Sequence, residues 1–169
     1  MERKSFEDMS CPVALALERV GEWWSILILR DATHGMTRFD EFQKSLGISP
    51  NSLSRRLGAL VQAGLLERHR YSEHPPRDEY VLTDAGRAFR PVLIALYAWG
   101  NEYYPPEAPN VRLVDNESGA DVDPVLVDSS TGRPLDDEHT TFLPGPAADE
   151  RLRAVLGRRN QSASKAQAK

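Results

Sequence analysis

The sequence predicts an α+β fold in which a winged helix-turn-helix domain, with long N- and C-terminal dimerisation helices, precedes a small β-rich C-terminal extension. Three observations predict it. A capped helix over residues 48–64 leads directly into two short strands with a charged tip. Long apolar helices flank this unit on both sides. Prolines after residue 104 then open a region of different composition.

Residues 12–32 are predicted to form one helix. Their apolar side chains are too numerous for a single stripe, so we expect this helix to be covered on two sides. One side would face its own domain and the other a second copy of the chain. Thr37 is expected to cap a short helix that ends at Leu46.

The next helix is predicted to begin at Pro50, with Ser49 as its N-cap and Gly64 beyond its end. Its apolar stripe is made by Leu53, Leu57, Leu60 and Val61. A rotation of about 100° per residue places small and polar side chains on the other face, with Arg56 on its flank: Asn51, Ser52, Arg55, Gly58, Ala59 and Gln62. Such a face can approach base edges and phosphates closely.

A two-stranded hairpin, the wing, is predicted over residues 65–82, with its tip at 72–78. Five arginines lie on the helix and the wing together: Arg55, Arg56, Arg68, Arg70 and Arg77. One isolated arginine would be an ordinary surface residue, but this clustering favours a nucleic-acid partner. In a helix-turn-helix arrangement the second helix is the one offered to a major groove.

After the wing, Thr83 is expected to cap a helix that runs to about Tyr104, with a kink or a break at Pro91. Too little domain remains to cover its aromatic side. We therefore expect it to pack with residues 12–32 of both subunits in a homodimer, whose two recognition helices would lie about 34 Å apart and match successive major grooves.

The composition divides the chain into a domain over residues 1–104, an acidic extension over 105–157 and a basic tail over 158–169 that is expected to be disordered. Short strands are predicted in the extension at 111–114, 125–127 and 140–143, with a short helix at 149–156. No internal repeat is expected.

Charge and composition narrow the function classes. The net charge is −4, but residues 38–90 carry nine basic and seven acidic side chains, whereas residues 105–148 carry two and nine. This distribution argues against indiscriminate coating of DNA and leaves a specific site open. One cysteine excludes an intrachain disulfide and a Cys-rich structural metal site. No apolar run reaches the ~18 residues of a membrane span, so we expect a soluble, cytoplasmic protein.

Enzymatic activity is not predicted. Cys11 has no discernible partner arrangement with any histidine, and there is no phosphate-binding glycine loop, so no cofactor or metal is expected. A winged-helix module that binds another protein, with residues 105–148 masking the basic face or holding the partner, is the alternative to a DNA-binding regulator.

The first hundred residues resemble the HxlR-type transcriptional regulators, a winged-helix family related in fold to the MarR type. The matching segments are Cys11-Pro12, GEWWSILILRDATHGMTRFDEF over 21–42, GISPNSLSRRLGAL over 47–60, and GLLERHRYSEHPPRDEYVLTDAGRAF over 64–89. The resemblance implies a homodimer that binds double-stranded DNA at a pseudo-palindromic operator, mostly as a repressor and sometimes as an activator. The DNA contacts it implies are Ser49, Asn51, Ser52, Arg55 and Arg56 in the helix and Arg68, Arg70, His74 and Arg77 in the wing.

Some longer members of the family look to carry a metal ribbon, with a Cys-Gly turn and a later C-x-x-C-G knuckle. The corresponding places here read Ser118-Gly119 and, over residues 128–132, DSSTG. The glycines are present and the thiolates are not. This suggests a ribbon that has lost its metal; an unrelated acidic β-rich extension is the alternative.

Two signals could control such a regulator. Cys11 precedes the first helix, where the helix dipole favours a reactive thiolate, and the resemblance implies sensing of oxidants or electrophiles at this place; a plain core cysteine is the alternative. A small aromatic or apolar effector could instead bind between the two long helices, although aromatic residues at helical spacing are more often core. The candidate pocket residues are Trp23, Trp24, Tyr97 and Trp99.

Overall fold

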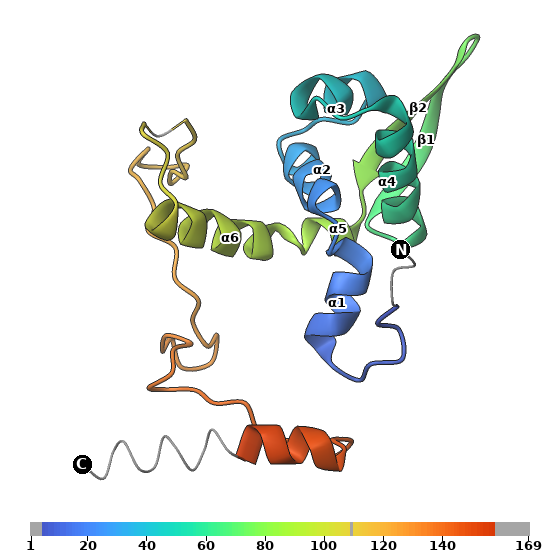
Figure 1. Cartoon of the computed structure of the whole chain (residues 1–169). Coiled ribbons are helices and arrows are strands. Elements are labelled where there is room, and N and C mark those ends of the chain that lie inside the picture. The colour runs from blue at the N-terminus through green and yellow to red at the C-terminus, as the bar shows by residue number, and fades with distance from the viewer. Residues whose placement is uncertain (1–4, 109, 158–169) are drawn as a thin grey trace. The chain divides into compact units, whose positions relative to one another are not determined.

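A computed structural model describes residues 5–108 and 110–157 of the chain (Figure 1). The predicted basic tail, residues 158–169, lies outside the described residues. The chain forms two compact units, Met1–Pro124 and Val125–Lys169. The first contains the winged helix-turn-helix fold, built from α1 (Pro12–Val20), α2 (Trp23–Thr33), α3 (Phe39–Leu46), α4 (Pro50–Gln62), β1 (Leu66–Glu73), β2 (Pro76–Leu82), α5 (Asp84–Arg87) and α6 (Arg90–Tyr103).

The single helix predicted over residues 12–32 is two helices. Gly21 interrupts it, and a Cβ at this position would lie only 2.4 Å from the carbonyl oxygen of Leu17. Glu22 then turns to an extended conformation and becomes the N-cap of α2. The prediction of one long helix was wrong. The apolar residues keep their helical spacing across Gly21, so the spacing did not reveal the break, which the lack of a side chain at Gly21 permits.

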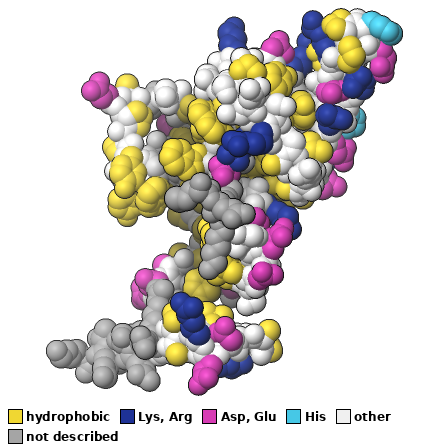
Figure 2. All heavy atoms as spheres, turned by 45° about the vertical axis from the view of Figure 1, so that its right-hand side comes forward, with side chains coloured by type: hydrophobic (Ala, Val, Ile, Leu, Met, Phe, Trp, Pro, Cys, Tyr) yellow, Lys and Arg dark blue, Asp and Glu magenta, His cyan; other side chains and the backbone are white. Residues whose placement is uncertain are grey.

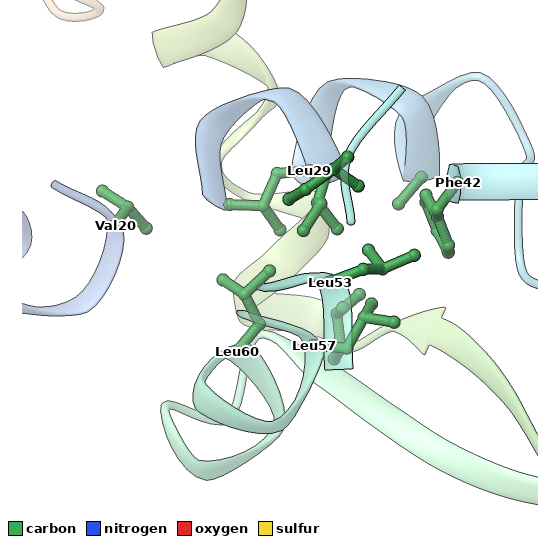
Figure 3. Close-up of a cluster of buried hydrophobic side chains, with 10 residues drawn as sticks. Val20, Leu29, Phe42, Leu53, Leu57 and Leu60 are labelled. Carbon is green, nitrogen blue, oxygen red and sulfur yellow. The ribbon is translucent and has the colours of Figure 1, made fainter. Parts of the chain in front are cut away.

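A small hydrophobic core joins the three helices that follow α1 (Figure 3). Its fully buried apolar side chains come from α2, α3, α4 and the first residue of β1: Ile28, Leu29, Phe42, Leu53, Leu57, Leu60 and Leu66. Each such side chain contributes about 1.5–3 kcal/mol to folding by leaving water. The stripe on α4 is the one predicted, and its burial fixes which face of α4 looks outward.

Local hydrogen bonds set the ends of α3 and α4. Ser49 Oγ accepts from the backbone N–H of Ser52 at 3.3 Å, and Gly64 follows α4 with φ +71°, as predicted. The cap of α3 differs from the prediction: it is Arg38 rather than Thr37. Glu41 Oε2 reaches back and accepts from both backbone N–H groups, which lowers the pKa of Glu41.

The wing covers the predicted residues, but its strands extend further into the predicted tip, pairing antiparallel from Leu66 opposite Leu82 to Glu73 opposite Pro76. Its register shifts between Arg70 and Ser72, so Tyr71 forms a bulge. The backbone N–H of Tyr80 donates to the carbonyl oxygen of Thr37 at 2.7 Å and ties the wing to the start of α3.

The helix after the wing is broken, which is one of the two outcomes expected at Pro91. Thr83 caps α5 by accepting from the N–H of Gly86 at 3.0 Å, and α6 begins at Arg90 with Pro91 in its first turn. With 14 residues in α6, 9 in α1 and 11 in α2, the expected long terminal helices are shorter than predicted. None of the helices in the described ranges is long and apolar enough to cross a bilayer.

Residues 105–124 belong with the first unit, although composition placed a boundary at 104. Tyr97 of α6 holds them, since its hydroxyl donates to the carbonyl oxygen of Val111 and accepts from the N–H of Leu113. Residues 150–157 are helical, as predicted. The three strands predicted in the extension are not formed; its described residues show only isolated bridges, Val114 with Asp121 and Val127 with Pro134.

The two bridges close two similar turns that lie 13 residues apart in the sequence. The chain therefore contains a short internal repeat, and the expectation of no repeat was wrong. Residues 113–122 read LVDNESGADV and residues 126–135 read LVDSSTGRPL. Each copy has a glycine with positive φ, Gly119 at +68° and Gly132 at +69°. The backbone hydrogen bonds also correspond, for example Asp115 N–H to Ala120 O and Asp128 N–H to Arg133 O, both 2.9 Å.

In each copy of the repeat, the side chain of the first aspartate accepts hydrogen bonds from residues two or three positions further along the turn. Asp115 Oδ1 accepts from the N–H and the hydroxyl of Ser118, both at 2.8 Å. Asp128 accepts from the N–H of Ser130 and the hydroxyl of Thr131, both at 2.9 Å. In the D-x-x-[ST]-G pattern, therefore, a carboxylate and a hydroxyl stand where a C-x-x-C-G knuckle has two thiolates.

Acidification should loosen these turns. Backbone N–H donors lower the pKa values of Asp115 and Asp128 below their ordinary 3.8, so the carboxylates stabilise the turns above that pH and lose this contribution as the pH falls through the lowered values. We expect the amide NMR signals of Ser118 and Ser130 to move below about pH 4. An Asp128→Ala variant should show the change at Ser130 already at pH 7, whereas Asp123→Ala should not.

Candidate nucleic-acid interface

The outward face of α4 is polar, exposed and free of acidic residues. Asn51 and Arg55 are exposed, and Gly58 and Ala59 leave the backbone beside them accessible. No carboxylate occurs between Glu41 and Glu67 in the sequence. Within the described residues, Arg55 takes part in no ion pair. The exposed face of α4 therefore offers an amide side chain and an available guanidinium, which suit a phosphate or an acceptor on a base edge.

Ser49 and Ser52 are partly engaged with each other. The hydroxyl of Ser49 accepts the cap hydrogen bond and donates to Ser52 Oγ at 3.0 Å. Both lie at the start of α4 beside Asn51, where backbone donors remain open to solvent. The structure thus places these three residues at the N-terminal end of α4, with Arg55 about one turn beyond Asn51.

Arg56 lies apart from that face. Its Nη2 is 2.6 Å from Glu22 Oε2, at the N-cap of α2, and its side chain is only 16 % exposed. The resemblance implied a DNA contact for Arg56, but the structure places it in an ion pair that joins α4 to α2.

Arg56→Ala should therefore destabilise the fold. We expect a loss of about 1–3 kcal/mol in the free energy of unfolding, because a charged hydrogen bond between packed helices is removed. Urea denaturation measures this loss. Arg55→Ala is the matched control, since truncation of the exposed neighbour should change stability by less than about 0.5 kcal/mol. Equal stability losses would contradict the assignment.

Two of the wing arginines are paired within the wing. Arg70 Nε is 2.5 Å from Asp78 Oδ1, with Glu73 at 3.5 Å, and Arg68 Nε is 3.8 Å from Asp78 Oδ2. The hydrogen bond that Arg70 donates to the carboxylate of Asp78 raises the pKa of Arg70. Figure 2 shows the projecting hairpin with basic, acidic and histidine side chains interspersed. A phosphate must therefore compete with Asp78 for both guanidinium groups.

Asp78→Asn should strengthen DNA binding. Release of the arginines is expected to lower the dissociation constant by up to about fivefold, the equivalent of about 1 kcal/mol for an exposed pair. The salt dependence should also become steeper, because more phosphate contacts release more counterions. Fluorescence anisotropy with labelled duplex at two salt concentrations tests this. Glu117→Gln, which removes one negative charge outside the wing, should leave the affinity within twofold.

The tip of the wing carries the remaining predicted contacts. His74 and Arg77 are both exposed, and neither has an ion pair with another described residue. Both side chains are therefore available to contact DNA phosphates beside the major groove that α4 would enter.

Sequence reasoning missed Arg38. Its guanidinium carbon lies 5.0 Å from the ring centre of Tyr71, the bulged residue of β1, so a cation–π contact holds it against the wing. Arg38 is exposed and adds a positive charge to this side of the interface. The sequence does show that Arg38 stands at the start of the predicted α3 helix. It does not show the bulge that brings Tyr71 to Arg38.

Cys11 is the N-cap residue of α1 and is partly exposed. Its side chain makes no cap hydrogen bond. In the part of the chain that the structure describes, no group of three or more His, Cys, Asp or Glu side chains is arranged to hold a metal ion.

The four aromatic residues predicted to line an effector pocket are not brought together. Trp24 packs against the core, whereas Trp23 is 83 % exposed. Trp99 is 54 % exposed and contacts Tyr103 and Tyr104, with ring centres 5.9 and 5.2 Å away. Tyr97 lines a cleft to which the other three residues do not contribute.

Comparison with known proteins gives a consistent result. Residues 19–108 match the model of the HxlR-like helix-turn-helix family. An uncharacterised HTH-type transcriptional regulator of Mycobacterium tuberculosis is 42 % identical over 141 residues, which cover 83 % of this chain and 89 % of that protein. PA1607, solved as a candidate transcription factor, is 42 % identical with a TM-score of 0.74, and the match covers 84 % of this chain and all of PA1607. The redox regulator HypR in its reduced form is 30 % identical with a TM-score of 0.52, over 54 % of this chain and 92 % of HypR.

Proposed function

Because the chain belongs to the HxlR-like helix-turn-helix family of DNA-binding transcriptional regulators, we propose that it acts as a homodimeric repressor on a pseudo-palindromic operator. The outward face of α4 carries the proposal. This face carries Asn51 and Arg55 beside small, exposed residues, and it has no carboxylate. Such a face can enter a major groove while the wing lies along the neighbouring backbone. This role belongs in the cytoplasm, with the chromosome.

Unburied apolar surface supports the homodimer. α6 has no buried residue, although most of its side chains are apolar. Val92, Leu96 and Trp99 are exposed on it, and Val13 and Leu17 are exposed on α1. Exposed apolar side chains in this number are typical of a protein interface. A second copy of the chain would bury it and set the distance between two α4 helices.

Mobility shift with duplexes selected from genomic DNA tests this function. Affinity for a selected duplex should fall steeply between about 50 and 200 mM salt, because each contacted phosphate releases counterions. A winged-helix module that binds only another protein would show no preference for the selected duplex over a scrambled one. That outcome would replace the DNA-binding proposal with the alternative.

We also propose that Cys11 senses oxidants or electrophiles. Its partly exposed position at a helix N-terminus supports this, as does the similarity to a redox regulator. An oxidant such as a disulfide would take two electrons and two protons from two thiols, linking two Cys11 residues or capping one with a small thiol. If Cys11→Ser protein still releases DNA on treatment with diamide, the sensor role is excluded.

A further inference from the structure

A cleft of about 630 Å³ lies within the first unit, between α2, α6 and the strap formed by residues 106–108 and 110–114. The strap is fastened to α6 through Tyr97, whose hydroxyl bonds to the backbone of Val111 at 3.2 Å and of Leu113 at 3.3 Å. This volume falls in the range of about 300–1,000 Å³ that is usual for small-molecule sites.

The lining combines apolar walls with positive charge. Leu27, Leu93, Ile94 and Leu113 supply apolar surface from all three segments. The charged lining residues are Arg30, Arg90 and Arg112, joined by His34, and no aspartate or glutamate lines the cleft. In a protein of net charge −4, a concave surface with only basic charges selects an anion.

Arg90 is the cation most available to a ligand. Arg30 is paired with Asp31 at 2.8 Å, and Arg112 with Asp121 at 2.7 Å. Arg90 is exposed and has no ion pair with another described residue. A bound carboxylate could accept hydrogen bonds from its guanidinium while an apolar body fills the space between α2 and α6.

We infer that this cleft binds a small amphipathic carboxylate, a molecule with one anionic end and an apolar body. The inference rests on the proposed function in one respect, that the ligand is an effector of DNA binding. α2 supplies Ile28 and Leu29 to the core that positions α4, whereas α6 carries the apolar surface for the second subunit. A ligand bound between α2 and α6 would change the angle between these two helices. That change would alter the distance between the two α4 helices of the dimer.

Isothermal titration of the full chain with 4-phenylbutyrate and with its uncharged amide, in the absence of DNA, tests the site. The carboxylate should bind at least tenfold more tightly than the amide. Arg90→Gln should remove most of that preference. Arg87→Gln, at an exposed arginine paired with Asp84 outside the cleft, should keep it. Equal affinity for the two compounds, or full preference in Arg90→Gln, would overturn the inference.

A second variant separates an open cleft from one covered by a second copy. Asn101 lines the cleft and is exposed, so Asn101→Trp should fold, fill the cleft and abolish binding of the carboxylate without changing the oligomeric state. Loss of the dimer in this variant, with no binding of the carboxylate to the unmodified protein, would mean that the partner occupies the cleft.

DNA binding is measured separately, on the selected duplex with and without 4-phenylbutyrate. If the protein bound the carboxylate but no DNA, the proposed ligand site would be supported and the proposed DNA-binding function would be rejected. DNA binding whose affinity does not move at saturating carboxylate would reject the effector role and leave the regulator standing.

Discussion

Replacing Arg55 with alanine should weaken binding to the selected operator by about 1–3 kcal/mol, a rise of roughly 5- to 150-fold in the dissociation constant. Arg55 is exposed on the face of α4 that the core turns outward, and no carboxylate within the described residues competes for it. A guanidinium in this position can reach the acceptors of a guanine edge. Fluorescence anisotropy with the selected and a scrambled duplex should show a much smaller effect on the scrambled one.

The neighbouring arginine supplies the control. Arg56→Ala should lose stability, and at a temperature where it remains folded it should retain more of its operator affinity than Arg55→Ala. If Arg56→Ala were folded and impaired as strongly as Arg55→Ala on the selected duplex alone, Arg56 would have to leave Glu22 and join the interface. Equal losses on both duplexes for Arg55→Ala would make it a phosphate contact instead of a base contact.

Replacing Trp99 with glutamate should separate the proposed dimer. Trp99 is exposed on α6, in contact with Tyr103 and Tyr104, and a carboxylate at the centre of an apolar interface is expected to cost about 2–4 kcal/mol of association free energy. Sedimentation velocity should show a monomer at concentrations where the unmodified chain is a dimer. Operator affinity should fall by about 100-fold or more, because two linked recognition helices bind far more tightly than one.

Val155→Glu is the control for this variant. Val155 has nearly the same exposed fraction as Trp99, 56 % against 54 %, but belongs to the second unit. It should leave both the sedimentation coefficient and the operator affinity unchanged. A monomeric unmodified chain, or a Trp99→Glu variant that sediments as a dimer, would contradict an interface at α6.

Features that depend on a few neighbouring residues were predictable from the sequence. The Ser49 cap, the buried stripe of α4, the end of that helix at Gly64 and the break near Pro91 all formed as expected. Each follows from hydrogen bonds or steric limits that span at most four residues. The repeated turns of the extension are also local, because each closes within ten residues, and the similar decapeptides at 113–122 and 126–135 could have been recognised in the sequence.

The sequence by itself determined the α+β class, the order of helices and wing, and the family. Only the tertiary structure decided which charges remain available: Arg56 is held by Glu22, 34 positions away in the chain, Arg70 is held by Asp78 across the wing, and Arg38 rests on Tyr71. The reason is physical. An ion pair or a ring contact depends on which surfaces pack together, and the spacing of residues along a helix carries no record of that packing.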